Sequence, residues 1–82
     1  MSFSEHAKER LQKRSINLSE EDLTRLGDTV ERMRAKGANS SLINMNDVAL
    51  VVSVANRKVI TAMDGMSAKD NIFTNIDSAA II

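Results

Sequence analysis

His6 is the chain's single histidine, and Arg10 and Arg14 follow it at intervals of four residues. Residues spaced this way share one side of a helix, so the three side chains would lie together. An imidazole can act as general acid or base while neighbouring guanidinium groups stabilise phosphate charge, as RNA cleavage requires. Arg57 could supply a further phosphate contact. His6, Arg10, Arg14 and Arg57 therefore form a candidate RNA site.

A structural role for His6, as a helix cap or a hydrogen-bond partner of the sheet, is the interpretation we favour. A lone histidine near arginines is common on amphipathic helices. The 11 basic and 11 acidic residues give a net charge of zero, so no overall attraction draws the chain onto nucleic acid. The only aromatic residues are two phenylalanines, which offer no stacking platform for single strands. We expect no nucleic-acid partner.

Other catalytic or cofactor-binding patterns are incomplete. The chain has no cysteine, which excludes thiolate zinc sites, thiol nucleophiles and disulfides. Asp64 and Gly65 resemble part of a calcium-binding loop, but Met66 and Ala68 occupy positions where that loop needs oxygen ligands. The three glycines form no phosphate-binding loop. We expect no catalytic residues, no cofactor, no metal and no enzymatic activity.

Length and patterning predict one domain over residues 1–82, because two cores would need roughly 200 residues. The chain divides near Gly37 into a helical half, 1–37, and a β half, 38–82. Its longest apolar stretch, 48–54, is too short to cross a bilayer, so no membrane insertion is expected. The first residues contain no hydrophobic signal region, which favours the cytoplasm.

Two helices are expected in the first half. Ser2 or Ser4 can cap a helix that runs to about residue 13 or 14. Ser19 has the start signals of a second helix, since acids follow at 20–22 and Leu18 is placed to pack on Leu23. The connection between the helices should place Ile16 and Leu18 in the core.

The second half is typical of β-strands. Strands are predicted over 41–45, 48–55 and 58–63, and the two-residue gaps between them indicate consecutive antiparallel hairpins. A loop over 64–70 and short extended pieces at 71–74 and 78–82, around a turn at Asn75 and Asp77, should follow. The predicted fold class is α+β, with two N-terminal helices packed on a three- to four-stranded antiparallel sheet.

An interaction surface is the remaining candidate site. The apolar residues 79–82 must be paired in the sheet or covered by a partner, because a free tail of that composition would aggregate. Flexible methionines suit adaptable binding surfaces, although core filling is the simpler account. A partner would add to a sheet edge within 71–82 or cover 63–66, and a homo-oligomer would use the same edge. The candidate partner-binding residues are Met63, Met66, Phe73, Ile76, Ile81 and Ile82.

Several segments together carry a family resemblance. They are Phe3-Ser4-x-His6-Ala7-x-x-Arg10-Leu11-x-x-Arg14-x-Ile16-x-Leu18-Ser19-x-x-Asp22-Leu23, Asp47-x-Ala49-Leu50-Val51-Val52-Ser53-Val54-x-Asn56-Arg57, Val59-Ile60-Thr61-Ala62-Met63 and Asn71-x-Phe73-Thr74-Asn75-Ile76-Asp77-Ser78-Ala79. With these segments the chain resembles the small bacterial flagellar operon proteins, which are encoded among hook and hook-cap genes. It departs from them at Ser15, where the family commonly has glycine.

The resemblance implies a non-enzymatic protein of flagellar biogenesis, acting in hook assembly as an adaptor, chaperone or regulator. Its implied partners are hook, hook-cap or export components, and its implied location is the cytoplasm or the basal body and export apparatus. A shorter likeness over about twenty residues, around His6, Arg10 and Arg14, is to small α+β domains related to RNA-cleaving toxins. It leaves a ribonuclease-like domain as the alternative function, although a shared fold does not transfer an activity.

Overall fold

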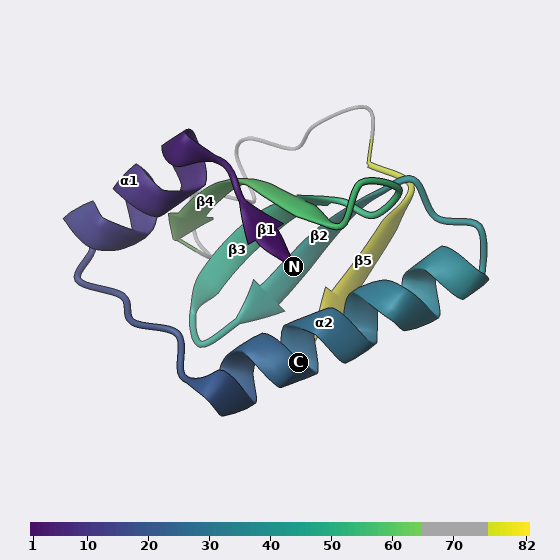
Figure 1. The fold of residues 1–82 in the computed structure, drawn as a ribbon, viewed down its shortest axis with the longest axis horizontal. Helices are drawn as coiled ribbons and strands as arrows, with labels where there is room; N and C mark the ends of the chain where they lie inside the picture. Colours follow the sequence, from purple (N-terminus) through teal and green to yellow (C-terminus); the bar gives the residue numbers. More distant parts are fainter. Residues whose placement is uncertain (65–75) are drawn as a thin grey trace.

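Two helices and a five-stranded mixed sheet make up the described part of the protein, residues 1–64 and 76–82, in a computed structural model (Figure 1). The predicted α+β class with two N-terminal helices is confirmed. The elements, in chain order, are β1 (Ser2–Phe3), α1 (Glu5–Lys13), α2 (Glu20–Ala35), β2 (Ser40–Met45), β3 (Val48–Ser53), β4 (Lys58–Asp64) and β5 (Ser78–Ile81).

Both helices begin at serine caps. The hydroxyl of Ser4 accepts a hydrogen bond from the N–H of Ala7 at 3.0 Å, so Ser4 starts α1 while Ser2 belongs to β1. At α2, the Ser19 hydroxyl accepts from the N–H of Asp22, and the Asp22 carboxylate accepts from the N–H of Ser19, each at 3.1 Å. This reciprocal capping box satisfies two N–H groups that have no partner inside the helix. The predicted start of the second helix is confirmed.

The hairpin between β2 and β3 has the expected two-residue turn. Asn46 and Asp47 both have positive φ, 54° and 63°, which is the requirement of a type I′ turn. The next connection differs from the prediction, since β3 ends at Ser53 and four residues, 54–57, separate it from β4. The N–H of Arg57 donates to the carbonyl of Val54 at 3.2 Å and closes a turn over 54–57, so the strand ends before the expected residue 55. The N–H of Val54 still donates to the carbonyl of Asn39 at 2.9 Å, in the β2–β3 register.

A β-bulge interrupts the pairing of β3 with β4. Val51 pairs with Thr61, whereas its neighbour Val52 pairs with Val59, so Ile60 is an extra residue on β4. Because of this insertion Val59 and Ala62 are both buried, although they are three positions apart, and Ile60 is 42% exposed.

Both edges of the sheet are formed by short parallel strands, in the order β1-β4-β3-β2-β5. β1 pairs with β4, and β5 pairs with β2 from Ser41–Ser78 to Asn44–Ile81. The sheet therefore has five mixed strands instead of three or four antiparallel ones. The two additional strands were missed for different reasons. β1 has only two residues, directly before the first helix, and β5 is aligned with β2 by the side chain of Asp77, far from β2 in the sequence.

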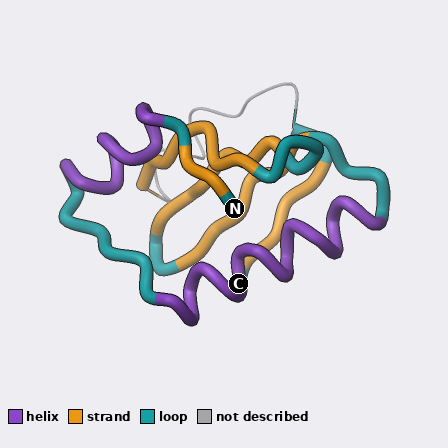
Figure 2. Tube along the Cα trace, viewed as in Figure 1, coloured by secondary structure: helices purple, strands orange, loops and turns teal. Residues whose placement is uncertain are grey.

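The core lies between the helices and one face of the sheet. Figure 2 shows the longer helix, α2, running along the sheet near the C-terminus. Its buried side chains are Leu26, Thr29 and Val30, and α1 contributes Ala7 and Leu11. The sheet contributes Ile43, Met45, Val48, Leu50, Val52, Val59 and Ala62, with Val54 from the turn after β3. Burying this apolar area supplies most of the drive for folding.

Candidate functional site

Strand β5 forms an edge of the sheet, because it pairs with β2 and no other described strand lies beyond it. The N–H of Ile82 donates inward to the carbonyl of Asn44 at 2.9 Å. Since successive N–H groups of a strand alternate in direction, those of Ala79 and Ile81 point away from β2. The side chain of Ile81 is 89% exposed. β5 thus offers both backbone donors and an apolar side chain to a further strand.

The sheet face opposite the helices is apolar next to this edge. The register places Ala79, Leu42 and Val51 in one row across the strands. A second row contains Ile81, Asn44, Ala49 and Met63. Beside β5 lies a hollow of about 470 Å³, which we call the β5 hollow, and its lining residues are Leu42, Asn44, Ala79, Ala80 and Ile81.

Asp77 positions β5. Its carboxylate accepts hydrogen bonds from the backbone N–H of Asn39, at 3.0 and 3.2 Å to its two oxygens, and from that of Ser40 at 3.2 Å. The bond from the Asn39 N–H is the main reason why the pKa of Asp77 lies below its ordinary value. The hydroxyl of Ser78 then donates to the carbonyl of Ser40 at 3.2 Å. The start of β2 and the start of β5 are therefore tied together.

Four of the six candidate partner-binding residues lie in the described part of the chain. Ile81 is exposed at the edge, and Met63 is half-buried in the same cross-strand row. Ile82 is half-buried against the core, and Ile76 is half-buried before β5. Met66 and Phe73 lie outside the described residues, as do the expected strand at 71–74, the turn residue Asn75 and most of the 64–70 loop.

Sequence reasoning missed Leu42, Asn44 and Asp77 as parts of this surface. Leu42 and Asn44 join it only through the parallel pairing with β5, and nothing near them in the sequence indicates that pairing. Asp77 was predicted only as a turn residue. Its short acidic side chain directly before a strand is the one local signal, because such side chains often bind backbone N–H groups.

The residues of the candidate RNA site do not form one open cationic cluster. His6 and Arg10 are exposed on α1, where Ser4 and not His6 is the cap. Arg14 forms an ion pair with Asp64, Nη1 to Oδ2 at 3.0 Å. Arg57 donates to Glu31 of α2 and lowers the pKa of that carboxyl. A phosphate would have to compete with both carboxylates for these arginines.

Residues 1–64 and 76–82 offer neither a cluster of metal ligands nor a membrane-spanning helix. No three His, Asp or Glu side chains converge there in a way that could hold a metal ion. Neither helix in that part of the chain is long and apolar enough to cross a bilayer.

Fold and site together define a small α+β protein whose described surface offers a sheet edge for pairing. A protein-family model described as "Putative flagellar" matches residues 59–81, which include most of β4 and all of β5. The match covers less than a third of the 82 residues. No curated protein and no solved structure matches the chain. The family match supports the flagellar part of the resemblance, while the operon context stays a prediction.

Proposed function

We propose that this protein is a non-enzymatic factor of flagellar biogenesis that acts in hook assembly by binding other proteins, as an adaptor, chaperone or regulator. The partners would be hook, hook-cap or export components, met in the cytoplasm or at the export apparatus. The family match over residues 59–81 supports the flagellar role. The observation that carries the binding mode is the edge strand β5 with Ile81 89% exposed.

The proposed mechanism is strand addition at β5. An extended segment of the partner would pair with the outward N–H and carbonyl groups of Ala79 and Ile81. Main-chain hydrogen bonds would supply much of the affinity. The side chain of Ile81 and the β5 hollow, which begins beside it, would select apolar side chains on the partner.

The test is affinity purification of the tagged protein, at native level, from the flagellated host during hook assembly, with mass spectrometry of the bound proteins. We expect hook, hook-cap or export components to co-purify. Recovery of RNA alone would favour the ribonuclease-like alternative, and recovery of the protein alone would favour self-association. Either result would contradict the proposal.

Two substitutions test the edge itself. Ala79→Pro removes an outward N–H and leaves the ladder to β2 intact, as proline is tolerated when its missing N–H faces solvent. Ile81→Lys places a charge on the edge, which discourages strand addition. Both variants should fold and lose the partner. Ile60→Lys, at another exposed isoleucine, is the matched control and should retain it. Capture that survives both edge substitutions would rule out strand addition at β5.

A further inference from the structure

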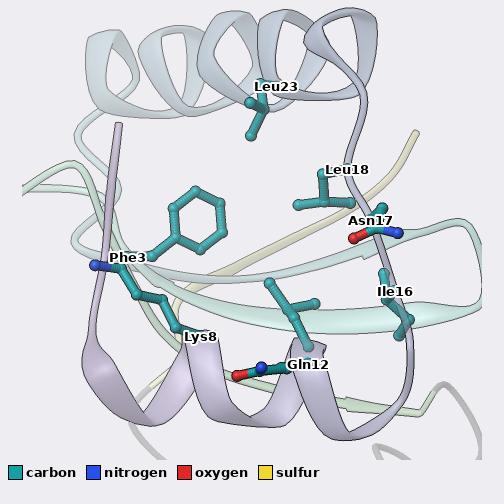
Figure 3. A pocket seen from close by; sticks show the side chains of 8 residues that line it. Phe3, Lys8, Gln12, Ile16, Asn17, Leu18 and Leu23 are labelled. Carbon is teal, nitrogen blue, oxygen red and sulfur yellow. The ribbon is translucent and has the colours of Figure 1, made fainter.

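A second hollow lies away from β5, between α1 and the first turns of α2. Figure 3 shows Phe3, Leu18 and Leu23 pointing into the space between the two helices. The groove has a volume of about 350 Å³ and is lined by Phe3, Lys8, Leu11, Gln12, Ile16, Asn17, Leu18 and Leu23. We call it the interhelix groove.

The floor of the interhelix groove is apolar and accessible. Leu23 is 37% exposed, and Phe3 and Leu18 are only half-buried, although each packs at the margin of the core. Ile16 and Leu18, which were expected in the core, are half-buried: they pack against it and also line this opening. A ligand that covered these side chains would gain roughly 25 cal/mol for each Å² of apolar surface removed from water.

The polar lining of the groove favours an anion. The polar lining residues are Lys8, Gln12 and Asn17, and none of the eight lining residues is acidic. The Lys8 nitrogen lies at the margin of the groove, on the side of Phe3 (Figure 3). Lys8 Nζ lies 3.5 Å from Glu5 Oε1, in a solvent-exposed pair. Such pairs contribute little free energy, and an ammonium has three donors, so Lys8 can also hold a ligand carboxylate.

The size of the groove favours a small molecule over a protein. Eight lining residues are far fewer than the roughly 20–30 that a stable protein interface engages on each side. Its volume falls at the lower end of the roughly 300–1,000 Å³ typical of small-molecule sites. We propose that the interhelix groove binds a small aliphatic carboxylate, with its hydrocarbon chain on Phe3, Leu18 and Leu23 and its carboxylate at Lys8. This site shares no residue with the β5 edge and does not depend on the proposed function.

Three probes with the same hydrocarbon tail test the proposal on the full chain. Sodium octanoate is titrated against the isotopically labelled protein below its micelle concentration, and binding is followed in amide NMR spectra. 1-Octanol and octylammonium carry the same tail with no charge and with the opposite charge. We expect saturable shifts centred on Leu18 and Leu23. Octanoate should bind about two- to fivefold more tightly than octanol, as one exposed ion pair permits, and octylammonium should bind most weakly.

Two variants separate the charge from the apolar floor. Lys8→Gln should abolish the preference for octanoate over octanol, while Lys13→Gln, on the same helix but outside the lining, should leave it unchanged. Leu23→Gln should weaken all three probes by about tenfold, the effect of losing one buried leucine contact. Ile81→Gln, at an exposed isoleucine on the opposite edge of the sheet and outside the lining, is its matched control.

Several outcomes would overturn the proposal. Amide shifts that do not saturate, or that spread over the whole surface, would be one such outcome. They would indicate non-specific adsorption of the probe, an adventitious additive only. Equal affinity for the three probes would remove the role of Lys8. Shifts gathered at Leu42 and Ile81 would move the ligand to the β5 hollow. A partner protein that protects Leu23 while octanoate does not would identify the groove as a protein-binding surface.

Discussion

The hydroxyl of Ser4 donates a hydrogen bond to the carbonyl of Ile60 at 2.5 Å, across 56 positions of sequence. The same hydroxyl caps α1 by accepting from Ala7, and the Ser4 N–H donates to the carbonyl of Val59 at 2.9 Å. Ile60 is the bulged residue of β4 and has no partner in the β3–β4 ladder. The bulge disrupts the regular ladder at this point, where the Ile60 carbonyl accepts from Ser4. One serine therefore joins the start of the first helix to the irregular point of the sheet.

Ser4→Ala should lower the free energy of unfolding by about 2 kcal/mol, because a helix cap and a tertiary hydrogen bond each contribute roughly 1 kcal/mol. Urea denaturation of the purified chain measures the loss. Ser2→Ala, at an exposed serine on the neighbouring strand, is the control and should change stability by less than about 0.5 kcal/mol. Equal effects of the two substitutions would show that the Ser4 hydroxyl does not link helix and bulge.

The Asp22 carboxylate should make stability depend on acid pH. The N–H of Ser19, and next the guanidinium of Arg25, lower the pKa of Asp22 to about 2 from its ordinary 3.8. A carboxylate with a lowered pKa in the folded state stabilises the fold fully above its unfolded pKa, and this stability is lost as the pH falls through the folded value. Unfolding midpoints should therefore decrease as the pH drops from about 4 towards 2.

The Asp22→Asn substitution separates the titration of Asp22 from the loss of stability that the other carboxylates cause at acid pH. The amide oxygen can still accept from the Ser19 N–H, but it does not titrate, so the variant should lose less stability than the wild type between about pH 4 and 2. Asp28→Asn, at an exposed position of the same helix, is the control. Identical pH profiles for Asp22→Asn and the wild type would exclude the capping carboxylate as the titrating group.

Asp77→Ala should release β5 from β2. The substitution removes the acceptor for the N–H groups of Asn39 and Ser40, which align the two strands. Hydrogen exchange measures the result: amides of residues 80 and 82 should lose protection, while those in the middle of α2 keep it. A uniform decrease across both elements would mean that β5 opens only with the whole fold.

Ser41→Ala should stabilise the protein by about 1 kcal/mol. The Ser41 hydroxyl is fully buried and has no hydrogen-bond partner within the described structure. Removal of an unsatisfied buried hydroxyl avoids its desolvation penalty and leaves only a small cavity. Thermal unfolding checks this, with Ser40→Ala as a comparison at the adjacent position. A destabilised Ser41→Ala variant would indicate that the hydroxyl has a partner.

The features that local chemistry determines were the ones predicted correctly. The start of α2 at Ser19 and the turn at Asn46–Asp47 each depend on residues within a few positions, so their types and spacing are sufficient. The bulge at Ile60 and the parallel placement of β5 depend on partners far along the chain. The alternation of apolar and polar residues along a strand does not reveal where a bulge inserts an extra residue. It also does not reveal whether a short strand pairs with its neighbour in parallel.

The candidate site divides in the same way. Ile81 was predicted because an apolar terminal segment must pair or be covered, which composition alone indicates. The contributions of Leu42 and Asn44 depend on the register of β2 with β5. Opposite charges sequester Arg14 and Arg57, and neither pairing follows from sequence spacing.

The late position of β5 in the sequence also gives the protein an order of folding. Asp77 meets Asn39 across 38 positions, whereas β2, β3 and β4 are joined by short turns. Closing the short loops costs less chain entropy, so the β2–β3–β4 meander should form before β5 pairs with β2. Until residues 78–81 pair, β2 is itself the open edge of the sheet, and this stage of folding is when the chain is most exposed to pairing with a wrong strand.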